Sequence, residues 1–596
     1  MRRSKLFVAL VFLWLIAGCA TKGGWYVATI AEASGAKKEE RVTDRQLERR
    51  AEALAHFGLG VMAQVGGDQT TARREFEKSL QADPDHEALA VDLVRDYLRS
   101  GDLEKAFQLL RRSAKQPHAT GWTFGYLGLL YRLKGQIKEA RKAFEEAIRR
   151  SPDIFLGYRG LADLLLREGK KKEAIDLIDK ALKAGGQRPE FLGDFAVWIA
   201  GQVGAKIFPP EEAKRWVQQA YQKLRGQKVT NPVVLEAMGD ACRRVGLIQE
   251  AIESYERLLK EWNPQNPLAQ VLIHEQLLRL YAAQNNTEGV RREAEALQQL
   301  TPNNPLPYML LGTLAFQENQ LSEAEKQFRQ ALSLDPKLES AYYRLAAVLI
   351  SQGKPKEALQ VLQQARGLFP PSFQMEFYTG VCYLALEEYK QALSHLISAQ
   401  IHAQLTDPNQ LTAFFYFQLG VAYHQSGRWP AAETALKKSI QKDPNFAPAL
   451  NYLGYSWADQ GKHLEEAYQL IRRAVKQDPN NAAYLDSLGW VLYRLGRYEE
   501  ALQYQLKAVQ NAEDPDPVLW DHLGDIYAAL GKKQKAIEAW KKALKLQPSK
   551  KIAQKIQAAQ QESKSSSKKK ASGQTPPARS HASQTNSSSA LHRSSQ

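Results

Sequence analysis

Residues 447–548 repeat one pattern three times: NYLGYSWADQGKHLEEAYQLIRRAV from Asn451, LDSLGWVLYRLGRYEEALQYQLKAV from Leu485 and WDHLGDIYAALGKKQKAIEAWKKAL from Trp520. Each copy has a Leu-Gly pair in its first half, then a Gly that marks a turn, then an Ala in its second half. Corresponding residues recur every 34 or 35 positions. A fixed period of this length indicates stacked helix-turn-helix units rather than separate globular domains.

The same pattern extends through most of the chain. Small residues at a helix crossing allow close approach, and a large side chain one turn later fills the space beside them. The alanines at the predicted crossings are Ala72, Ala106, Ala140, Ala174, Ala213, Ala251, Ala324, Ala358, Ala392, Ala432, Ala467, Ala501 and Ala536. One further unit fits between the sixth and seventh of them. The pattern resembles the tetratricopeptide repeat (TPR), which implies an all-α superhelical solenoid of about 14 repeats.

Changes in the period predict how the chain is divided. We expect a tether over 19–46, an N-terminal repeat block over 47–187, degenerate units over 188–303 and a C-terminal block over 304–548. A capping helix over 549–562 would shield the last repeat, because a solenoid end needs a polar outer face. Residues 563–596 are rich in Ser, Lys, Pro and Gln without an apolar period, which is typical of a disordered basic tail.

The first 18 residues have the pattern of an export signal. Three cations precede the apolar run LFVALVFLWLIAG at 6–18, which is too short to span a bilayer. Ile16-Ala17-Gly18-Cys19 resembles the lipobox of bacterial lipoproteins. The resemblance implies cleavage after residue 18, lipidation at Cys19 and an outer-membrane, periplasm-facing location; an ordinary signal peptide or anchor with an incidental Cys is the alternative.

Charge and motifs argue against several functions. The net charge is +16, but the tail supplies six of these charges and the leader three. The body of the chain is therefore only mildly basic, and we expect no nucleic-acid partner. The sequence has no HExxH, P-loop, G-x-S-x-G or dinucleotide motif. It predicts no catalytic residue, no metal and no cofactor, so the chain is not expected to be an enzyme.

Cys242 and Cys382 lie four repeats apart and are expected to be buried thiols.

The resemblance also predicts where a partner would bind. In TPR-like hairpins the first helices line the concave face. Their period projects ten side chains of the C-terminal block into the groove: Tyr343, Phe377, Phe414, Phe417, His424, Asn451, Tyr455, Asp486, Trp490 and Tyr493. Aromatic residues interleaved with polar ones are typical of partner sites. A register error of one residue would instead place several of them in the core.

The phrases NYLGYSWADQG and LDSLGWVLYRLGRYEEAL are similar to those of proteobacterial TPR lipoproteins. One such protein is the adaptor of a periplasmic carboxyl-terminal-processing protease. The resemblance implies a lipid-anchored scaffold that binds proteins and delivers substrates to such a protease. The alternative is a structural lipoprotein of a secretion, pilus or exopolysaccharide-export machine.

Overall fold

The computed structural model describes residues 44–262 and 266–571. The predicted signal peptide, Cys19, most of the tether and the tail beyond residue 571 lie outside these ranges. Within the described ranges the chain is helical, with one short 3₁₀ turn and no strand. No helix of this part of the chain is both long enough and apolar enough to span a bilayer.

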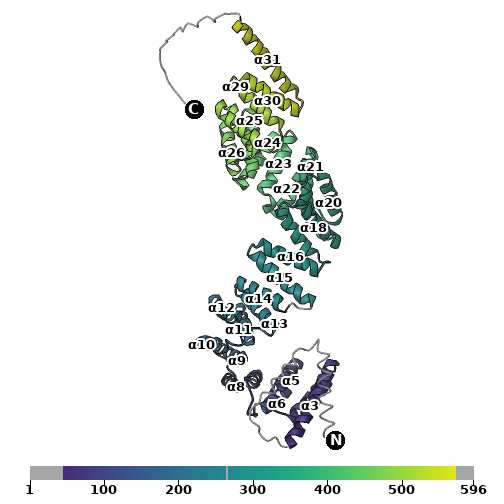
Figure 1. Ribbon diagram of the computed structural model, residues 1–596, viewed down its shortest axis with the longest axis vertical. Helices are drawn as coiled ribbons and strands as arrows, with labels where there is room; N and C mark the ends of the chain where they lie inside the picture. Colours follow the sequence, from purple (N-terminus) through teal and green to yellow (C-terminus); the bar gives the residue numbers. More distant parts are fainter. Residues whose placement is uncertain (1–43, 263–265, 572–596) are drawn as a thin grey trace, which may run out of the picture. The chain divides into compact units, whose positions relative to one another are not determined.

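Across the described residues, 28 helices follow one another along the chain as fourteen pairs, and α31 comes after them. Figure 1 labels most of these helices. The prediction of an all-α TPR solenoid is confirmed. The first seven pairs are α3 (Asp44–Val65), α4 (Gln69–Ala82), α5 (Glu87–Ser100), α6 (Leu103–Ser113), α7 (Gly121–Leu133), α8 (Ile137–Arg150), α9 (Phe155–Arg167), α10 (Lys171–Ala184), α11 (Pro189–Gly204), α12 (Pro210–Arg225), α13 (Pro232–Arg244), α14 (Ile248–Trp262), α15 (Pro267–Ala283) and α16 (Thr287–Leu300).

The remaining elements continue the alternation. They are α17 (Pro305–Gln317), α18 (Leu321–Leu334), α19 (Glu339–Ser351), α20 (Pro355–Leu368), α21 (Phe373–Ala385), α22 (Tyr389–Thr406), η1 (Pro408–Gln410), α23 (Ala413–Gln425), α24 (Trp429–Lys442), α25 (Ala447–Gln460), α26 (Leu464–Gln477), α27 (Ala482–Arg494), α28 (Tyr498–Asn511), α29 (Pro517–Ala529), α30 (Lys533–Leu546) and α31 (Lys550–Ala571).

The chain forms two compact units that divide between Leu280 and Tyr281. This division falls inside α15 and within the 188–303 region, where the repeat period is irregular. Unit 1 contains the pairs from α3 to α14, and unit 2 contains those from α17 to α30 together with α31.

A left-handed residue makes the turn inside most pairs. Gly67, Gly101, Gly135 and Gly169 have φ between 76° and 82° and are each 34 residues apart. Glycine adopts this conformation without the steric penalty that a Cβ brings. A few pairs carry another residue there, including Glu387 with φ 59°.

The predicted crossing alanines are buried in the structure, and the paired glycines explain the close approach. A Cβ added to Gly128 would lie 2.6 Å from the ring of Phe144, and one on Gly524 would lie 2.3 Å from Trp540. Both distances are far below van der Waals contact. In these two pairs the first helix can therefore lie against the second only because glycine occupies this position.

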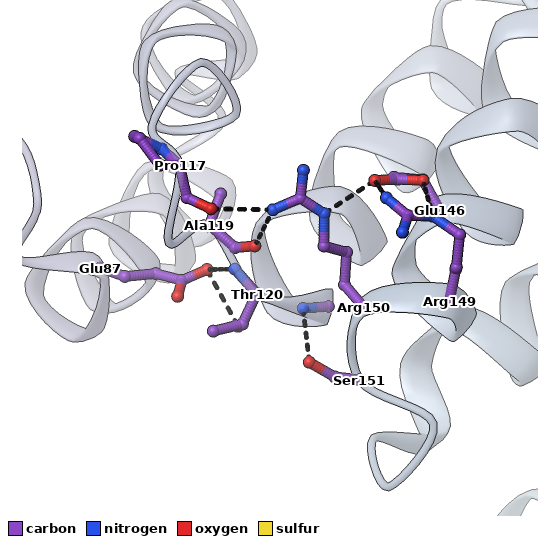
Figure 2. Close-up of polar contacts among 9 residues, drawn as sticks. Glu87, Pro117, Ala119, Thr120, Glu146, Arg149, Arg150 and Ser151 are labelled. Carbon is purple, nitrogen blue, oxygen red and sulfur yellow. Dashed lines mark hydrogen bonds and ion pairs between the residues drawn. The ribbon is translucent and has the colours of Figure 1, made fainter.

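Polar side chains join one pair to the next, as the junction before α7 illustrates (Figure 2). The carboxylate of Glu87 accepts hydrogen bonds from the backbone N–H of Thr120 at 2.8 Å and from its hydroxyl at 3.0 Å. Arg150 donates from Nη1 to the carbonyl oxygens of Pro117 and Ala119, each at 3.1 Å. The connection between α6 and α7 is thus held by helices on both sides of it.

Two predicted boundaries need correction, and the structure also explains why Ala392 and Ala432 are 40 residues apart. Helix α3 begins at Asp44, inside the expected tether, because the helical run starts before residue 47. Helix α31 continues to Ala571, so the capping helix is longer than 549–562 and the proposed tail does not begin at 563. The long step near residue 400 arises because α22 has 18 residues and η1 follows it, rather than from a loop alone.

Candidate protein-binding groove

The first helices of neighbouring pairs contact one another in unit 2. Contacts join α19 to α21, α21 to α23, α25 to α27, and α27 to α29. Side chains on the same face of these helices therefore form one continuous surface. All ten predicted groove residues lie on these first helices.

Two of the predicted groove residues are buried between repeats rather than exposed in the groove. Tyr343 and Phe377 are each only 7% exposed. The hydroxyl of Tyr343 lies 2.9 Å from Ser372 Oγ at the start of α21, and Phe377 contacts Phe373, Phe414 and Phe415. The prediction that both face an open groove is wrong, because the next first helix covers them.

Phe414 is the accessible member of the set, with 46% of its side chain exposed. Its ring packs edge-on against Phe377 at 5.9 Å and against Phe446 at 6.4 Å. Phe417 is half-buried and contacts Phe446 and Tyr452. An exposed Phe supported by other rings presents a rigid apolar surface to a partner.

His424 and Tyr452 link α23 to α25. The Nδ1 atom of His424 lies 2.9 Å from the hydroxyl of Tyr452, and the imidazole packs against Trp429 at 4.9 Å. Burial lowers the pKa of His424, because the charged form loses its hydration. His424 is therefore neutral at pH 7 and acts as an aromatic support for Tyr452.

Rings from three successive first helices converge in the last repeats. Trp490 on α27 lies parallel to Tyr493, with their ring centres 5.0 Å apart, and to His522 on α29 at 4.1 Å. Tyr455 on α25 lies 6.3 Å from the same imidazole. We call Phe414, Phe417, Tyr455, Trp490 and Tyr493 the aromatic row. All five are exposed or half-buried.

Two polar atoms beside the aromatic row have no hydrogen-bond partner among the described residues. They are Oδ1 of Asn451 on α25 and Nε1 of Trp490 on α27. One is an acceptor and the other a donor, and leaving either unsatisfied costs roughly 1–3 kcal/mol. Both atoms are buried, so a partner lying on the aromatic row would not reach them.

Asp486 is buried and binds inside the protein, which contradicts its predicted place in the groove. Its carboxylate accepts hydrogen bonds from Nδ1 of His522, at 2.9 and 3.1 Å, and from Nε2 of Gln505. Burial alone would lower the pKa of His522, but the charge and hydrogen bond of Asp486 outweigh it, so this pKa is raised. Asp486 thus positions His522, and through it Trp490.

Helix α29, the first helix of the last pair, carries an ion cluster that was not predicted from the sequence. Lys555 of α31 donates to Asp521 at 2.8 Å and to Asp525 at 2.7 Å. Trp540 donates from Nε1 to Asp525 at 3.0 Å. Asp521 and Asp525 occupy the repeat positions of Asp486 and Trp490, so extending the projection by one unit would have found them.

The groove of unit 1 is built differently. Arg95 donates from Nε to the hydroxyl of Tyr126 at 2.7 Å, and its guanidinium lies 5.3 Å from the ring centre of Trp122. Asp163 accepts from Arg132 and from Trp198, each at 3.2 Å. Hydrogen bonds of charged side chains therefore connect the first helices here, where ring contacts do so in unit 2.

The predicted thiols behave as expected. Cys242 and Cys382 are both buried and free. Burial raises the pKa of both, to about 12 for Cys382, so neither thiolate forms at neutral pH. No group of three metal-ligating side chains occurs in the part of the chain that the structure describes.

Comparison with known families agrees with this architecture. Two families described as "Tetratricopeptide repeat" match residues 410–554 and 126–189. A third, described as "Anaphase-promoting complex, cyclosome, subunit 3", matches residues 317–399. The chain therefore has the TPR solenoid fold and carries TPR repeats, which typically serve as protein-interaction scaffolds.

Individual relatives are distant. The chain is 25% identical over 363 residues to "Cellulose synthase operon protein C" of Pseudomonas fluorescens (strain SBW25), a match that covers 52% of this chain and 28% of that protein. It is 22% identical over 233 residues to "TPR repeat-containing protein YpiA" of Bacillus subtilis (strain 168). This match covers 39% of this chain and 51% of that protein. The chain thus spans about half, or less, of the length of each of these two relatives.

One solved structure, "Crystal structure of APC/C hetero-tetramer Cut9-Hcn1", aligns with this chain. The alignment covers 81% of this chain and 98% of the chain in that structure. Its sequence identity is 13% and its TM-score is 0.38. None of these relatives assigns a partner to the aromatic row.

Proposed function

We propose that this chain is a lipid-anchored scaffold of the bacterial envelope, which binds a protein through the aromatic row and delivers it to a periplasmic protease. The anchor would be a diacylglycerol attached at Cys19, which places the repeats on the periplasmic side of the outer membrane. The lipobox pattern and the phrases shared with TPR lipoproteins support this location. The protease is an inference from that resemblance.

One observation supports the binding role above the others. Tyr455 and Trp490 are half-buried, and both rings converge on the imidazole of His522 from α25, α27 and α29. Partly exposed rings held in this way suit an extended or helical peptide whose apolar side chains pack on them.

A photocrosslinking residue at Phe414 tests this role in the native envelope. We expect it to capture a periplasmic protease or its substrate, identified by mass spectrometry. The same residue at exposed Glu499, on the second helix α28, is the matched control. Trp490→Ala combined with Tyr455→Ala should abolish capture at Phe414 while helicity is retained. Equal capture from both positions, or capture that survives the double substitution, would contradict binding at the aromatic row.

A second candidate is a structural component of an exopolysaccharide-export machine. The likeness to "Cellulose synthase operon protein C" favours it, although it covers only 28% of that protein. The same crosslinking experiment separates the two functions. Capture of polysaccharide synthesis or export proteins, with no protease or hydrolase, would select the second.

A further inference from the structure

The end of unit 2 reverses the charge of the repeats before it. Residues 532–555 carry nine lysines, no arginine and a single acid, Glu538. Residues 281–531 carry 27 acids and 21 cations. We call residues 532–555, which form α30 and the start of α31, the lysine cap. An acidic series of repeats therefore ends in a strongly basic surface.

Most of these lysines are directed to solvent. The exposed ones are Lys532, Lys535, Lys541, Lys542, Lys545, Lys550 and Lys551. Among the described residues none of the seven forms an ion pair with a carboxylate, whereas Lys555 is paired with two. Two of them lie near rings: Lys542 Nζ is 4.1 Å from the ring centre of Trp520, and Lys535 Nζ is 5.8 Å from that of Tyr527.

Helix electrostatics do not explain this arrangement. A cation in the last turn, such as Lys545, is favourable because the C-terminal end of a helix is partly negative. Lys532 and Lys535, however, lie at the N-terminal end of α30, where a cation is unfavourable. Lys541 and Lys545 are four residues apart on one face and repel each other. The cluster thus opposes the stability of α30 and needs another reason.

Ion pairing between repeats does not explain it either. In the preceding repeats, second-helix cations pair with an acid further along the chain, as Arg329 of α18 does with Glu357 of α20 at 3.5 Å. Arg291 of α16 pairs in the same way with Glu318 at 2.6 Å. In the described part of the chain α30 is followed by α31 rather than by another helix pair, and the seven exposed lysines have no ion pair of this kind there.

The choice of lysine indicates what the surface binds. Arginine is preferred where a phosphate is gripped in a fixed, bidentate geometry, as in nucleic-acid recognition, while lysine supplies a mobile point charge. Residues 281–531 use ten arginines and 11 lysines, yet the lysine cap uses lysine alone. Leu546, which is 41% exposed, adds an apolar side chain beside Lys545. A diffuse layer of anionic headgroups over hydrocarbon matches this composition.

We propose that the lysine cap is a docking surface for an anionic phospholipid membrane. Each lysine near such a surface strengthens binding about fivefold, and this effect falls off within a Debye length. Seven exposed lysines therefore hold the end of unit 2 at the membrane without inserting a helix. This role is independent of the lipid proposed at Cys19 and of the partner proposed for the aromatic row.

Vesicle sedimentation with the full chain, made without lipid modification, tests the proposal. We expect binding to vesicles that contain about one-third phosphatidylglycerol, little binding to pure phosphatidylcholine, and release at roughly 0.5 M salt. Substituting Gln for Lys535, Lys541, Lys542 and Lys545 should weaken partitioning by roughly 500- to 1,000-fold, because four contributions of about fivefold each are lost. Gln keeps the helix propensity close to that of Lys.

The matched control removes the same charge from another part of unit 2. Gln substitutions of the exposed Lys326, Lys337, Lys356 and Lys390 should leave vesicle binding within a few-fold. The leader and tail are identical in every variant, so the difference reports the lysine cap. Circular dichroism checks helicity. If the first variant loses it, Gln at Lys532, Lys550 and Lys551 tests the same surface with a smaller expected effect.

Three outcomes would overturn the proposal. The first is unchanged vesicle binding in the cap variant. The second is an equal loss in the control variant, which would mean that only net charge matters. The third is binding of duplex DNA that is tighter than vesicle binding at the same salt concentration and is lost in the cap variant, which would make the lysine cap a nucleic-acid site.

Discussion

The imidazole of His522 stacks on the indole of Trp490, with ring centres 4.1 Å apart and planes 15° from parallel. Asp486, on the same helix as Trp490, holds the imidazole through Nδ1. A cation above an indole face is attracted by the ring, most strongly where water is excluded. The carboxylate and the indole therefore both favour the protonated form of His522, and together they join α27 to α29.

The stability of the last repeats should depend on pH through His522. Its pKa is raised in the folded chain because Asp486 outweighs the opposing effect of burial. The stabilisation is therefore fully present below the unfolded pKa of about 6.5 and is lost as pH rises through the folded pKa. We expect the amides of α29 to exchange more slowly with deuterium, relative to global unfolding, as pH is lowered towards 6.

His522→Gln isolates this effect. The variant should be less stable than the parent chain at pH 6. This difference in stability should be smaller above the pKa that His522 has in the folded chain. His424→Gln is a control of opposite sign, because burial lowers the pKa of His424. If the loss of stability in His522→Gln is the same at all pH values, His522 contributes by packing alone.

Gly489 should not tolerate a side chain. A Cβ there would lie 2.6 Å from Gln505 Oε1 and 3.3 Å from the carbonyl oxygen of Ala501. Gln505 cannot withdraw freely, because its Nε2 binds Asp486 and the carbonyl oxygen of Leu519. Gly489→Leu should overpack the crossing of α27 and α28 and destabilise the chain by roughly 1–3 kcal/mol, measured by denaturant unfolding.

Gly367 is the matched control for that substitution. It lies in α20, and nothing is within 4 Å of the place its Cβ would occupy. Gly367→Ala should stabilise by up to about 1 kcal/mol, since Ala is the better helix former. Comparable losses from Gly489→Leu and Gly367→Ala would mean that crossing distance is not what selects glycine.

The repeat period could be derived from the sequence because packing imposes it. Gly454, Gly489 and Gly524 each face a large side chain that leaves no room for a Cβ, so their spacing reflects the geometry of every pair. The burial of Tyr343 and Asp486 could not be derived in this way. A repeat position defines the face of a helix, but their burial depends on Ser372 and His522, which come from the next first helix.

His522 itself was hidden for a related reason. The corresponding positions in the two preceding repeats hold Tyr452 and Ser487, so no shared residue type marks this position. Its ring meets Trp490 only because α27 and α29 lie side by side. Residues that pack within one helix pair recur with the repeat period and can be predicted from it. Residues that make contacts between pairs depend on which side chains the next pair carries.

Glu387 should be a site where substitution stabilises the fold. It makes the turn between α21 and α22 with φ 59°, where Gly353 and Gly427 make the equivalent turns before and after it. The left-handed conformation costs a residue with a Cβ roughly 1 kcal/mol. Glu387→Gly should therefore raise the free energy of unfolding by up to about 1 kcal/mol, seen as a higher denaturant midpoint. Glu387→Ala, which keeps the Cβ, should give no such gain.

Lys555 should decide whether α31 stays docked on the last pair. Its ammonium group bridges Asp521 and Asp525, and all three side chains are mostly buried. Burial raises the pKa of Asp525, and for Lys555 the two aspartates outweigh burial and raise its pKa. Lys555→Met keeps the apolar stem next to Trp540 but leaves two carboxylates without a cation.

Removing one partner of a buried ion pair costs about 3–5 kcal/mol, and the partial exposure here places the loss below that range. We expect faster hydrogen exchange in α31 of Lys555→Met, with α25 unchanged, because each repeat depends on its neighbours. Adding Asp521→Asn and Asp525→Asn should restore much of the protection, since the unpaired charges are then gone. Equal exchange in α31 of the parent and Lys555→Met would mean that Ile552 and Ile556, which pack beside Trp540, hold the helix without the ion cluster.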